Sequence, residues 1–255
     1  MHIYQYWHSK DIPNYISPLL YSFRYVNPSS QYMLFDQVAA DRFITAHFSM
    51  RQVKAFRACA VPAMQADYFR YCAILASGGA YADADMLCIA ELQPLLSERI
   101  RAGAIFRRPN QNIMNAFFLF RSPASLFLRL VLEIATANIE NRLTEDVWLT
   151  TGPGLFTFLD LLHRAGSFEA FEEQEKYNED KAVPAFANLM CRTIGDFEKV
   201  RQAFGQVEIL SEAELDRYTI LPSMHFPYKD TDVHWTKVKG SIFKPDLNQS
   251  HDKEG

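Results

Sequence analysis

The feature that most constrains the fold of this chain is the stretch Gly78–Leu87, which reads GGAYADADML. A double glycine closes a helical pattern, and a short run of small and apolar residues follows it. In an extended backbone, side chains alternate between faces, so Tyr81, Asp83 and Asp85 would share one face and the three alanines the other. The Cα atoms of the two aspartates would then lie roughly 6.6 Å apart. Because two like charges at the end of a buried strand repel each other, we predict a cation between them.

The composition is that of an ordinary globular protein, since 49% of the 255 residues are hydrophobic and 22% are charged. We find no internal repeat and no linker that would divide the chain. We therefore expect one domain over residues 1–245 and a polar tail over 246–255. The formal charge of -4 and the pI near 6.0, without a basic run, argue against nucleic acid as a partner.

The cysteines are widely spaced and form no C-x-x-C pair, so we expect small buried side chains in a reducing compartment. The sequence starts at Met1 without a basic region followed by a long apolar region, and no run approaches the roughly 20 apolar residues of a membrane span. We expect no transmembrane segment. The expected location is the cytoplasm, with peripheral contact at the inner membrane face left open.

The first half of the chain alternates between strand and helix patterns. Residues 2–7 predict a strand, 18–25 a helix, 31–36 a second strand and 39–48 a second helix. This order predicts a parallel sheet with right-handed crossovers. A capping box over 49–52 opens a helical segment that runs to Cys59, and a second helix over 63–77 leads to the double glycine. The predicted fold class is α/β, with a mostly parallel central sheet flanked by helices.

The second half is expected to complete the sheet and to add helices. Ile113–Phe120 is a nearly continuous apolar run, typical of a strand buried on both faces, and Asn115 is its one strongly polar side chain. The acidic stretch 169–180 is expected to be a solvated face or a mobile connection. The other expected elements are a helix over 91–101, a strand over 104–106, a helix from a Ser122-Pro123 cap to Glu140, a turn capped by Thr144, a helix over 155–164, and strands over 207–210 and 218–221.

Two polar features are open to more than one interpretation. Asp67, Arg70 and Tyr71 fall at i, i+3 and i+4 of a predicted helix, hence on one side of it. Taken alone, the first two are an ordinary ion pair on a helix surface. The run 150–154 precedes a predicted helix, and it either presents backbone N–H groups to an anionic or hydroxylated ligand or forms a plain glycine turn.

The acidic pair suits a hard divalent cation. Mg²⁺ and Mn²⁺ prefer oxygen ligands, Mn²⁺ also accepts imidazole, and such sites often leave coordination positions for substrate phosphates. His234, late in the chain, is a candidate third ligand beside Asp83 and Asp85. A bare D-x-D is common by chance, whereas the glycines before it and the Asp67–Tyr71 segment upstream make the pattern far more specific.

Five separated blocks together resemble a known family. They correspond to the patterns H-Q-x-W, S/A-D-x-x-R-Y…G-G-x-Y-x-D-x-D, N-x-F, T-G-P and H-H-W, and they are Tyr4–Trp7, Ala66–Asp85, Asn115–Phe117, Thr151–Pro153 and Val233–Trp235. These are the patterns of DXD-containing glycosyltransferases with a GT-A fold, such as yeast Golgi initiating α-mannosyltransferases, capsular-polysaccharide sugar transferases and, more distantly, large clostridial glucosylating toxins. Tyr4 and Val233 depart from the family, which has histidine at both positions.

The resemblance implies a GT-A-like, Rossmann-related sheet and a set of site residues. Asp85 would be the principal ligand of Mn²⁺ or Mg²⁺, and Asp83 would contact ribose or sugar hydroxyls and the metal. His234 would lie near the diphosphate or complete the metal shell. Asp67 and Arg70 would hydrogen-bond the donor sugar, and Arg70 would help to bind negative charge on the leaving group.

The remaining implied roles concern substrate binding. Trp7 would flank the nucleobase, which aromatic stacking makes physically reasonable. The other residues that the matching blocks imply for substrate binding are Gln5, Tyr6, Tyr71, Gly79, Tyr81, Asn115, Thr151, Gly152 and Trp235.

The implied reaction is sugar transfer from a UDP- or GDP-sugar to a hydroxyl of a glycan, lipid-linked or protein acceptor, with retention of anomeric configuration, in polysaccharide or glycoconjugate synthesis. Asp83, Asp85 and Arg70 would carry it by holding and stabilising the diphosphate. Two alternatives stay open at this point. One is a non-catalytic nucleotide-sugar or glycan-binding module, and the other is a metal-dependent phosphoester hydrolase, which normally needs more ligands around two metals.

Overall fold

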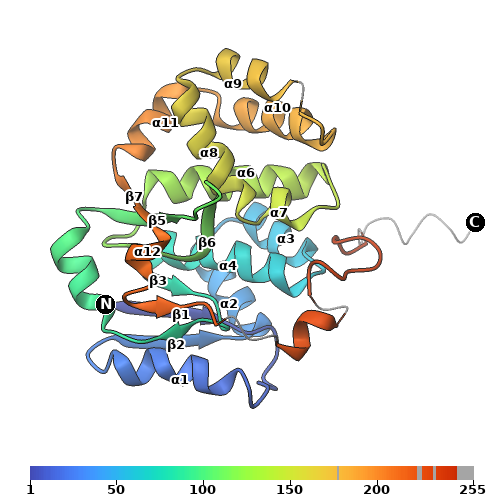
Figure 1. Cartoon of the computed structure of the whole chain (residues 1–255). Coiled ribbons are helices and arrows are strands. Elements are labelled where there is room, and N and C mark those ends of the chain that lie inside the picture. The colour runs from blue at the N-terminus through green and yellow to red at the C-terminus, as the bar shows by residue number, and fades with distance from the viewer. Residues whose placement is uncertain (177, 223–225, 232–233, 246–255) are drawn as a thin grey trace, which may run out of the picture.

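The computed structural model describes residues 1–176, 178–222, 226–231 and 234–245. Its centre is a sheet in which the strands lie in the order β2-β1-β3-β6-β5-β7, with helices on both faces (Figure 1). The strand bounds are β1 His2–Tyr6, β2 Gln31–Phe35, β3 Gly79–Ala82, β5 Gly103–Arg107, β6 Ile113–Phe120 and β7 Val207–Ser211. Within this sheet, β6 runs antiparallel to its neighbours and the other strands run parallel to one another. The predicted mostly parallel central sheet flanked by helices is therefore confirmed.

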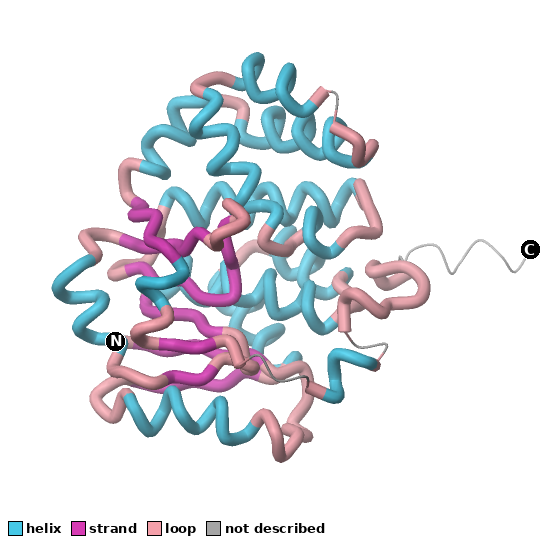
Figure 2. Tube along the Cα trace, in the orientation of Figure 1, coloured by secondary structure: helices cyan, strands magenta, loops and turns pink. Residues whose placement is uncertain are grey.

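The two faces of the sheet are covered by different helices, which surround the strands in Figure 2. On one face, Phe23, Leu92, Leu95, Leu96 and Leu215 form one apolar cluster with the sheet, and a larger cluster joins the helices within residues 37–77 and 126–204 to the opposite face. The helices of the first half are α1 Ser17–Val26, α2 Gln37–His47, α3 Met50–Ala58, α4 Pro62–Ser77 and α5 Leu92–Pro94, which continues as the helical turn Leu95–Arg99. These elements match the sequence prediction to within a few residues.

Strand β3 lies so close to β1 that the second residue of the glycine pair has no room for a side chain. Gly79 has a φ of 100°, and a Cβ added to it would lie 2.4 Å from the carbonyl oxygen of His2. Its neighbour Gly78 ends α4 with a φ of 66°. The double glycine is thus a backbone requirement that brings the end of α4 into the middle of the sheet.

The helices of the second half are α6 Leu126–Asn141, α7 Val147–Thr150, α8 Gly154–Ala165, α9 Phe168–Glu175, α10 Ala182–Ile194, α11 Phe197–Phe204 and α12 Glu212–Leu215. Helices α9, α10, α11 and α12 were not predicted from the sequence. Of these, α10 and α11 pack with α8 and α9 over α6 at the top of Figure 1. The sequence analysis was right about the acidic stretch 169–180, in which the acidic side chains are exposed or half-buried.

The predicted start of helix α6 was wrong. Helix α6 begins after Ser125, whose hydroxyl oxygen accepts from the backbone N–H of Leu128, and not at Ser122. The intervening Ala124 has a φ of 65°, and its N–H donates to the carbonyl oxygen of Leu75 at 2.8 Å, so this loop is tied to α4 before the helix begins. The predicted turn capped by Thr144 is confirmed, because its hydroxyl oxygen accepts from the Asp146 N–H at 3.1 Å, and Asp146 in turn caps α7.

The end of the chain crosses the carboxyl edge of the sheet and then returns to the helices. The short strands β4 Leu87–Cys88 and β8 Thr219–Ile220 pair antiparallel, and the single turn Pro227–Asp230 follows. Val233 and the expected tail 246–255 lie outside the described residues, and the single domain over 1–245 stays a prediction. Over the described part of the chain, the helices are too short or too polar to span a bilayer.

Candidate active site

The two aspartates lie at the carboxyl edge of the sheet, but not in one extended strand. Strand β3 ends at Ala82, and Asp85 sits in a turn that the Met86 N–H closes by donating to the Asp83 carbonyl oxygen at 3.1 Å. The expected extended backbone through Asp85 was therefore wrong. Gln5 holds this turn, because its buried amide donates to the same carbonyl oxygen at 3.1 Å. Both carboxylates nevertheless face one pocket.

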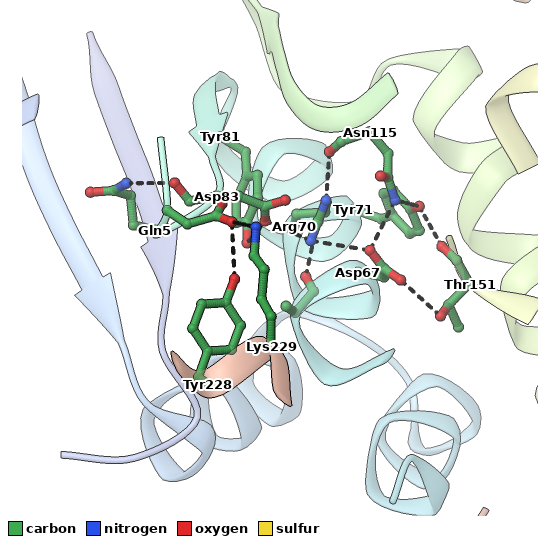
Figure 3. A network of polar contacts seen from close by, with 12 residues as sticks. Gln5, Asp67, Arg70, Tyr71, Tyr81, Asp83, Asn115, Thr151, Tyr228 and Lys229 are labelled. Carbon is green, nitrogen blue, oxygen red and sulfur yellow. Dashed lines mark hydrogen bonds and ion pairs between the residues drawn. The ribbon is translucent and has the colours of Figure 1, made fainter. Parts of the chain in front are cut away.

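Arg70 is the centre of the polar network below this turn (Figure 3). Its Nη2 lies 2.8 Å from Asp83 Oδ1 and 3.1 Å from Asp67 Oδ1, and its Nη1 donates to the Asn115 carbonyl oxygen at 2.6 Å. The side chains of Arg70 and Asp67 are 4% and 8% exposed, so the pair is not a surface ion pair. One guanidinium thus connects helix α4, the end of β3 and strand β6, a fork geometry that lysine cannot reproduce.

Asp67 is fixed by donors from three elements. Asn115 Nδ2 donates to its Oδ1 at 2.9 Å, and Thr151 Oγ1 donates to its Oδ2 at 3.1 Å. Tyr71 in turn donates to the Thr151 carbonyl oxygen at 2.5 Å and accepts from Asn115 at 3.0 Å. Burial raises the pKa of Asp67 to about 7, while the charge of Arg70 acts in the opposite direction. The carboxylate is therefore held in one orientation and depends on Arg70 for its charge.

Asp83 is more open than Asp67. Its side chain is 28% exposed, and its Oδ1 accepts from Tyr81 at 3.2 Å as well as from Arg70. The Arg70 guanidinium carbon also lies 4.6 Å from the centre of the Tyr81 ring. Desolvation raises the pKa of Asp83, Arg70 opposes this shift, and the charge of Asp85 adds to it. Among the described residues, the second oxygen of Asp83 has no hydrogen-bond partner.

Asp85 contacts the part of the chain that follows β8 and extends to residue 245, which we call the late segment. Its Oδ2 accepts from the Tyr228 hydroxyl at 2.9 Å and lies 2.8 Å from Lys229 Nζ. The sequence analysis missed both residues. Their one available signal was position, because they lie a few residues before His234 in the same late segment, and residue type alone gave no indication.

The pocket in front of these groups has a volume of about 280 Å³. Ten of the residues predicted for the site line it, and these are Tyr6, Trp7, Asp67, Arg70, Asp83, Asp85, Asn115, Gly152, His234 and Trp235. Trp7 directly follows β1, and its ring meets Tyr228 edge-on with centroids 5.5 Å apart. Lining residues that were not predicted include His8, Arg108 and Trp148. The pocket thus combines an aromatic end with a strongly charged floor.

The other predicted residues support the pocket wall from behind. Gln5, Tyr71, Tyr81 and Thr151 are fully buried and act through the hydrogen bonds described above. Gly79 is buried against β1, where the backbone requires it. Gly152 does line the pocket, and a Cβ added there would lie 2.9 Å from the Trp148 Cα, so the 150–154 run also packs closely on α7.

The donor set fits a divalent cation that keeps some ligands for substrate. Within the described residues there is no group of three His, Cys, Asp or Glu side chains placed to hold a metal, so His234 does not join the two aspartates. Its Nδ1 instead lies 2.8 Å from Thr236 Oγ1, and desolvation lowers its pKa. Two carboxylates with unoccupied oxygens suit Mg²⁺ or Mn²⁺, which commonly bind through one or two carboxylates together with substrate phosphates.

One comparison with known protein families covers residues of this site. Residues 13–101 match the glycosyltransferase sugar-binding region containing a DXD motif. The matched region includes Asp67, Arg70 and both aspartates of the turn, and it supports the expected enzyme class, a glycosyltransferase. The more specific likeness to yeast initiating mannosyltransferases stays a prediction.

Searches with the whole chain add less. No curated protein matches it. Among solved structures, it is similar to the PaToxG glycosyltransferase, with 13% sequence identity, a TM-score of 0.43, and coverage of 80% of this chain and 84% of that chain.

Proposed function

We propose that this protein is a metal-dependent, retaining glycosyltransferase that moves a sugar from a UDP- or GDP-sugar to a hydroxyl of a glycan, lipid-linked or protein acceptor. The observation that carries the proposal is the joining of Asp67, Arg70 and Asp83 into one buried network beside Asp85, at the floor of a single pocket. The family match covers these same residues. Polysaccharide or glycoconjugate synthesis would be the setting of the reaction, and a cytoplasmic location stays a prediction.

Asp85 and Asp83 would hold the Mg²⁺ or Mn²⁺ ion through the carboxylate oxygens that lack a partner among the described residues. When bound, the ion would act as a Lewis acid and neutralise charge on the departing diphosphate. Arg70 already occupies the other oxygen of Asp83. Its role is then to keep that carboxylate in place and to reduce the repulsion between the two aspartates.

The remaining lining residues would position the donor. Trp7 and Tyr228 form the aromatic end of the pocket, which suits a nucleobase. Asp67 and Asn115 face the pocket from the opposite side, and carboxylate and amide oxygens are good acceptors for sugar hydroxyls. Because Asp67 and Asn115 are hydrogen-bonded to each other and contact Arg70, Tyr71 and Thr151, these groups are held in place before the donor binds, which lowers the cost of orientation.

The two alternative functions differ in what they require. A two-metal phosphoester hydrolase calls for further carboxylate or histidine ligands around the acidic pair, and the described residues supply no third one. A non-catalytic binding module would keep the same pocket but bind without turnover. Measured turnover of a nucleotide sugar would therefore distinguish the transferase from a binding module.

The test is a screen of UDP- and GDP-sugars with Mn²⁺ or Mg²⁺, scoring hydrolysis or transfer by release of nucleoside diphosphate. Wild-type protein is expected to turn over at least one donor, and Asp85→Asn is expected to lose at least about 100-fold of that rate, as expected when a group that stabilises the transition-state charge is removed. Asp41→Asn is the matched control, because Asp41 pairs with Arg57 outside the pocket. Binding without turnover would favour the binding module, and full activity of Asp85→Asn would overturn the proposed site.

A further inference from the structure

Lys229 places an ammonium group on the aspartate that is proposed to bind the metal. Its Nζ lies 2.8 Å from Asp85 Oδ2, and its side chain is 28% exposed, whereas that of Asp85 is 12% exposed. The same nitrogen lies 5.3 Å from the centre of the Phe226 ring and 5.7 Å from that of Tyr228. In Figure 3, the side chain extends from the late segment toward the turn that carries both aspartates.

Contacts made before and after Lys229 in the sequence fix the position of its backbone. Before it, strand β8 pairs with β4 immediately after the aspartate turn, and the buried Phe226 stacks on Tyr15 with centroids 6.2 Å apart. After it, the chain is tied to the loop that follows α3, where the Ala60 N–H donates to the Ile242 carbonyl oxygen at 2.9 Å. The ammonium group is therefore part of the pocket and not the end of a loose surface side chain.

The charges on the pocket floor do not balance without a further cation. Asp67, Asp83 and Asp85 face Arg70 and Lys229, and the further arginine that lines the pocket, Arg108, is paired with Glu212 3.6 Å away, so one negative charge is left over. A divalent cation would reverse this balance, and a diphosphate would then restore it. A metal ion bound to Asp85 would also weaken the attraction between Asp85 and the Lys229 ammonium group, because two cations on one carboxylate repel each other. The nearest anion of matching chemistry would be the diphosphate itself.

We propose that Lys229 is a phosphate-binding residue of the donor site, which passes from Asp85 to a diphosphate oxygen when metal and donor bind. This assignment rests on the proposed function. Lys229 and the divalent cation would then compete for Asp85 in the free protein. In the complex, both would bind the diphosphate. A lysine ammonium, with three donors on a flexible stem, is suited to such an exchange.

The assignment predicts effects of opposite sign for one substitution. In Lys229→Ala, Mn²⁺ alone should bind at least about threefold more tightly, since the competing cation has gone. UDP or GDP should bind about tenfold or more weakly, both in EDTA and with Mn²⁺, because a charge-assisted hydrogen bond to phosphate is lost. The preference for the diphosphate over the matching nucleoside should fall by the same factor. If Lys229 only stabilised the position of the late segment, Lys229→Ala would weaken nucleoside and diphosphate binding by similar factors.

The experiment measures Mn²⁺ affinity by electron paramagnetic resonance and UDP, GDP, uridine and guanosine affinity by calorimetry, for the full chain. Lys229→Arg should keep most of the diphosphate affinity, and exposed Lys239→Ala should behave as wild type. Unchanged diphosphate and Mn²⁺ affinities in Lys229→Ala, with normal binding by wild type, would overturn the Lys229 assignment alone. If wild type binds neither diphosphate in the presence of Mn²⁺, the proposed function fails together with it.

Discussion

Replacing Arg70 by methionine would leave two carboxylates without the guanidinium that joins them. Asp67 is 8% exposed at its side chain, and the lost contacts to Asp67 and Asp83 measure 3.1 and 2.8 Å. Removing one partner of a buried ion pair costs about 3–5 kcal/mol, because an uncompensated charge stays buried. For a chain of this size, each kcal/mol lowers the melting temperature by about 2–4 °C, so a fall of roughly 6–20 °C is expected.

The destabilisation should also grow with pH. Arg70 is the largest influence that lowers the pKa of Asp67, which burial raises to about 7. Without Arg70 this pKa rises further above its unfolded value, so the folded variant favours the protonated acid. Its stability is then greatest at low pH and is lost as pH rises through the folded pKa. Chemical denaturation at pH 5.5 and pH 8 should therefore give a smaller difference from wild type at pH 5.5.

Controls separate this effect from the loss of any arginine. Arg57→Met removes an ion pair with Asp41 in which the arginine side chain is 53% exposed, and it should cost less than about 1 kcal/mol. The double variant Arg70→Met/Asp67→Asn should regain part of the loss, since one stranded charge has been removed. A melting temperature within about 2 °C of wild type for Arg70→Met would refute the reasoning.

Three further predictions follow from single contacts. Gly79→Ala should lower the free energy of unfolding by at least about 1 kcal/mol in urea titration, because the new Cβ meets the backbone of β1 and φ is 100°; an unchanged midpoint would contradict the close approach. Asp160→Ala should cost about 3 kcal/mol in the same assay, since Asp160 is 1% exposed between Arg107 and Arg164, each 2.9 Å away. Trp7→Ala should weaken UDP or GDP binding about fivefold or more without comparable loss of pyrophosphate binding, and equal losses would argue against a base-stacking role.

Much of the fold could be predicted because its signals are local. The alternation of strand and helix patterns gave the elements up to β3, and the apolar run gave β6 as a strand buried on both faces. The direction of β6 could not be predicted, since a strand buried on both faces reads the same in a parallel and in an antiparallel pair. Helices α10 and α11 were not predicted, because they follow the acidic stretch 169–180, which was interpreted as exposed to solvent, and their amphipathic patterns were not recognised.

The site was predicted less completely than the fold. Spacing placed Asp67 and Arg70 on one side of a helix, but only the packing of β6 against α4 shows that this side is buried. The extended backbone predicted through Asp85 was wrong because the turn is set by contacts from β1 and β6, which lie far away in sequence. Lys229 could not be found from spacing, since 144 positions separate it from Asp85 and the contact depends on the path of the late segment.

The central claim is that Asp83 and Asp85 hold a divalent cation that binds a nucleoside diphosphate. The most direct test is a crystal structure of the full chain soaked with MnCl₂ and UDP or GDP, with anomalous scattering used to locate manganese. We expect a manganese peak coordinated by Asp85 and by diphosphate oxygens, with the base beside Trp7. A diphosphate bound elsewhere, or bound in this pocket without manganese on either aspartate, would contradict it.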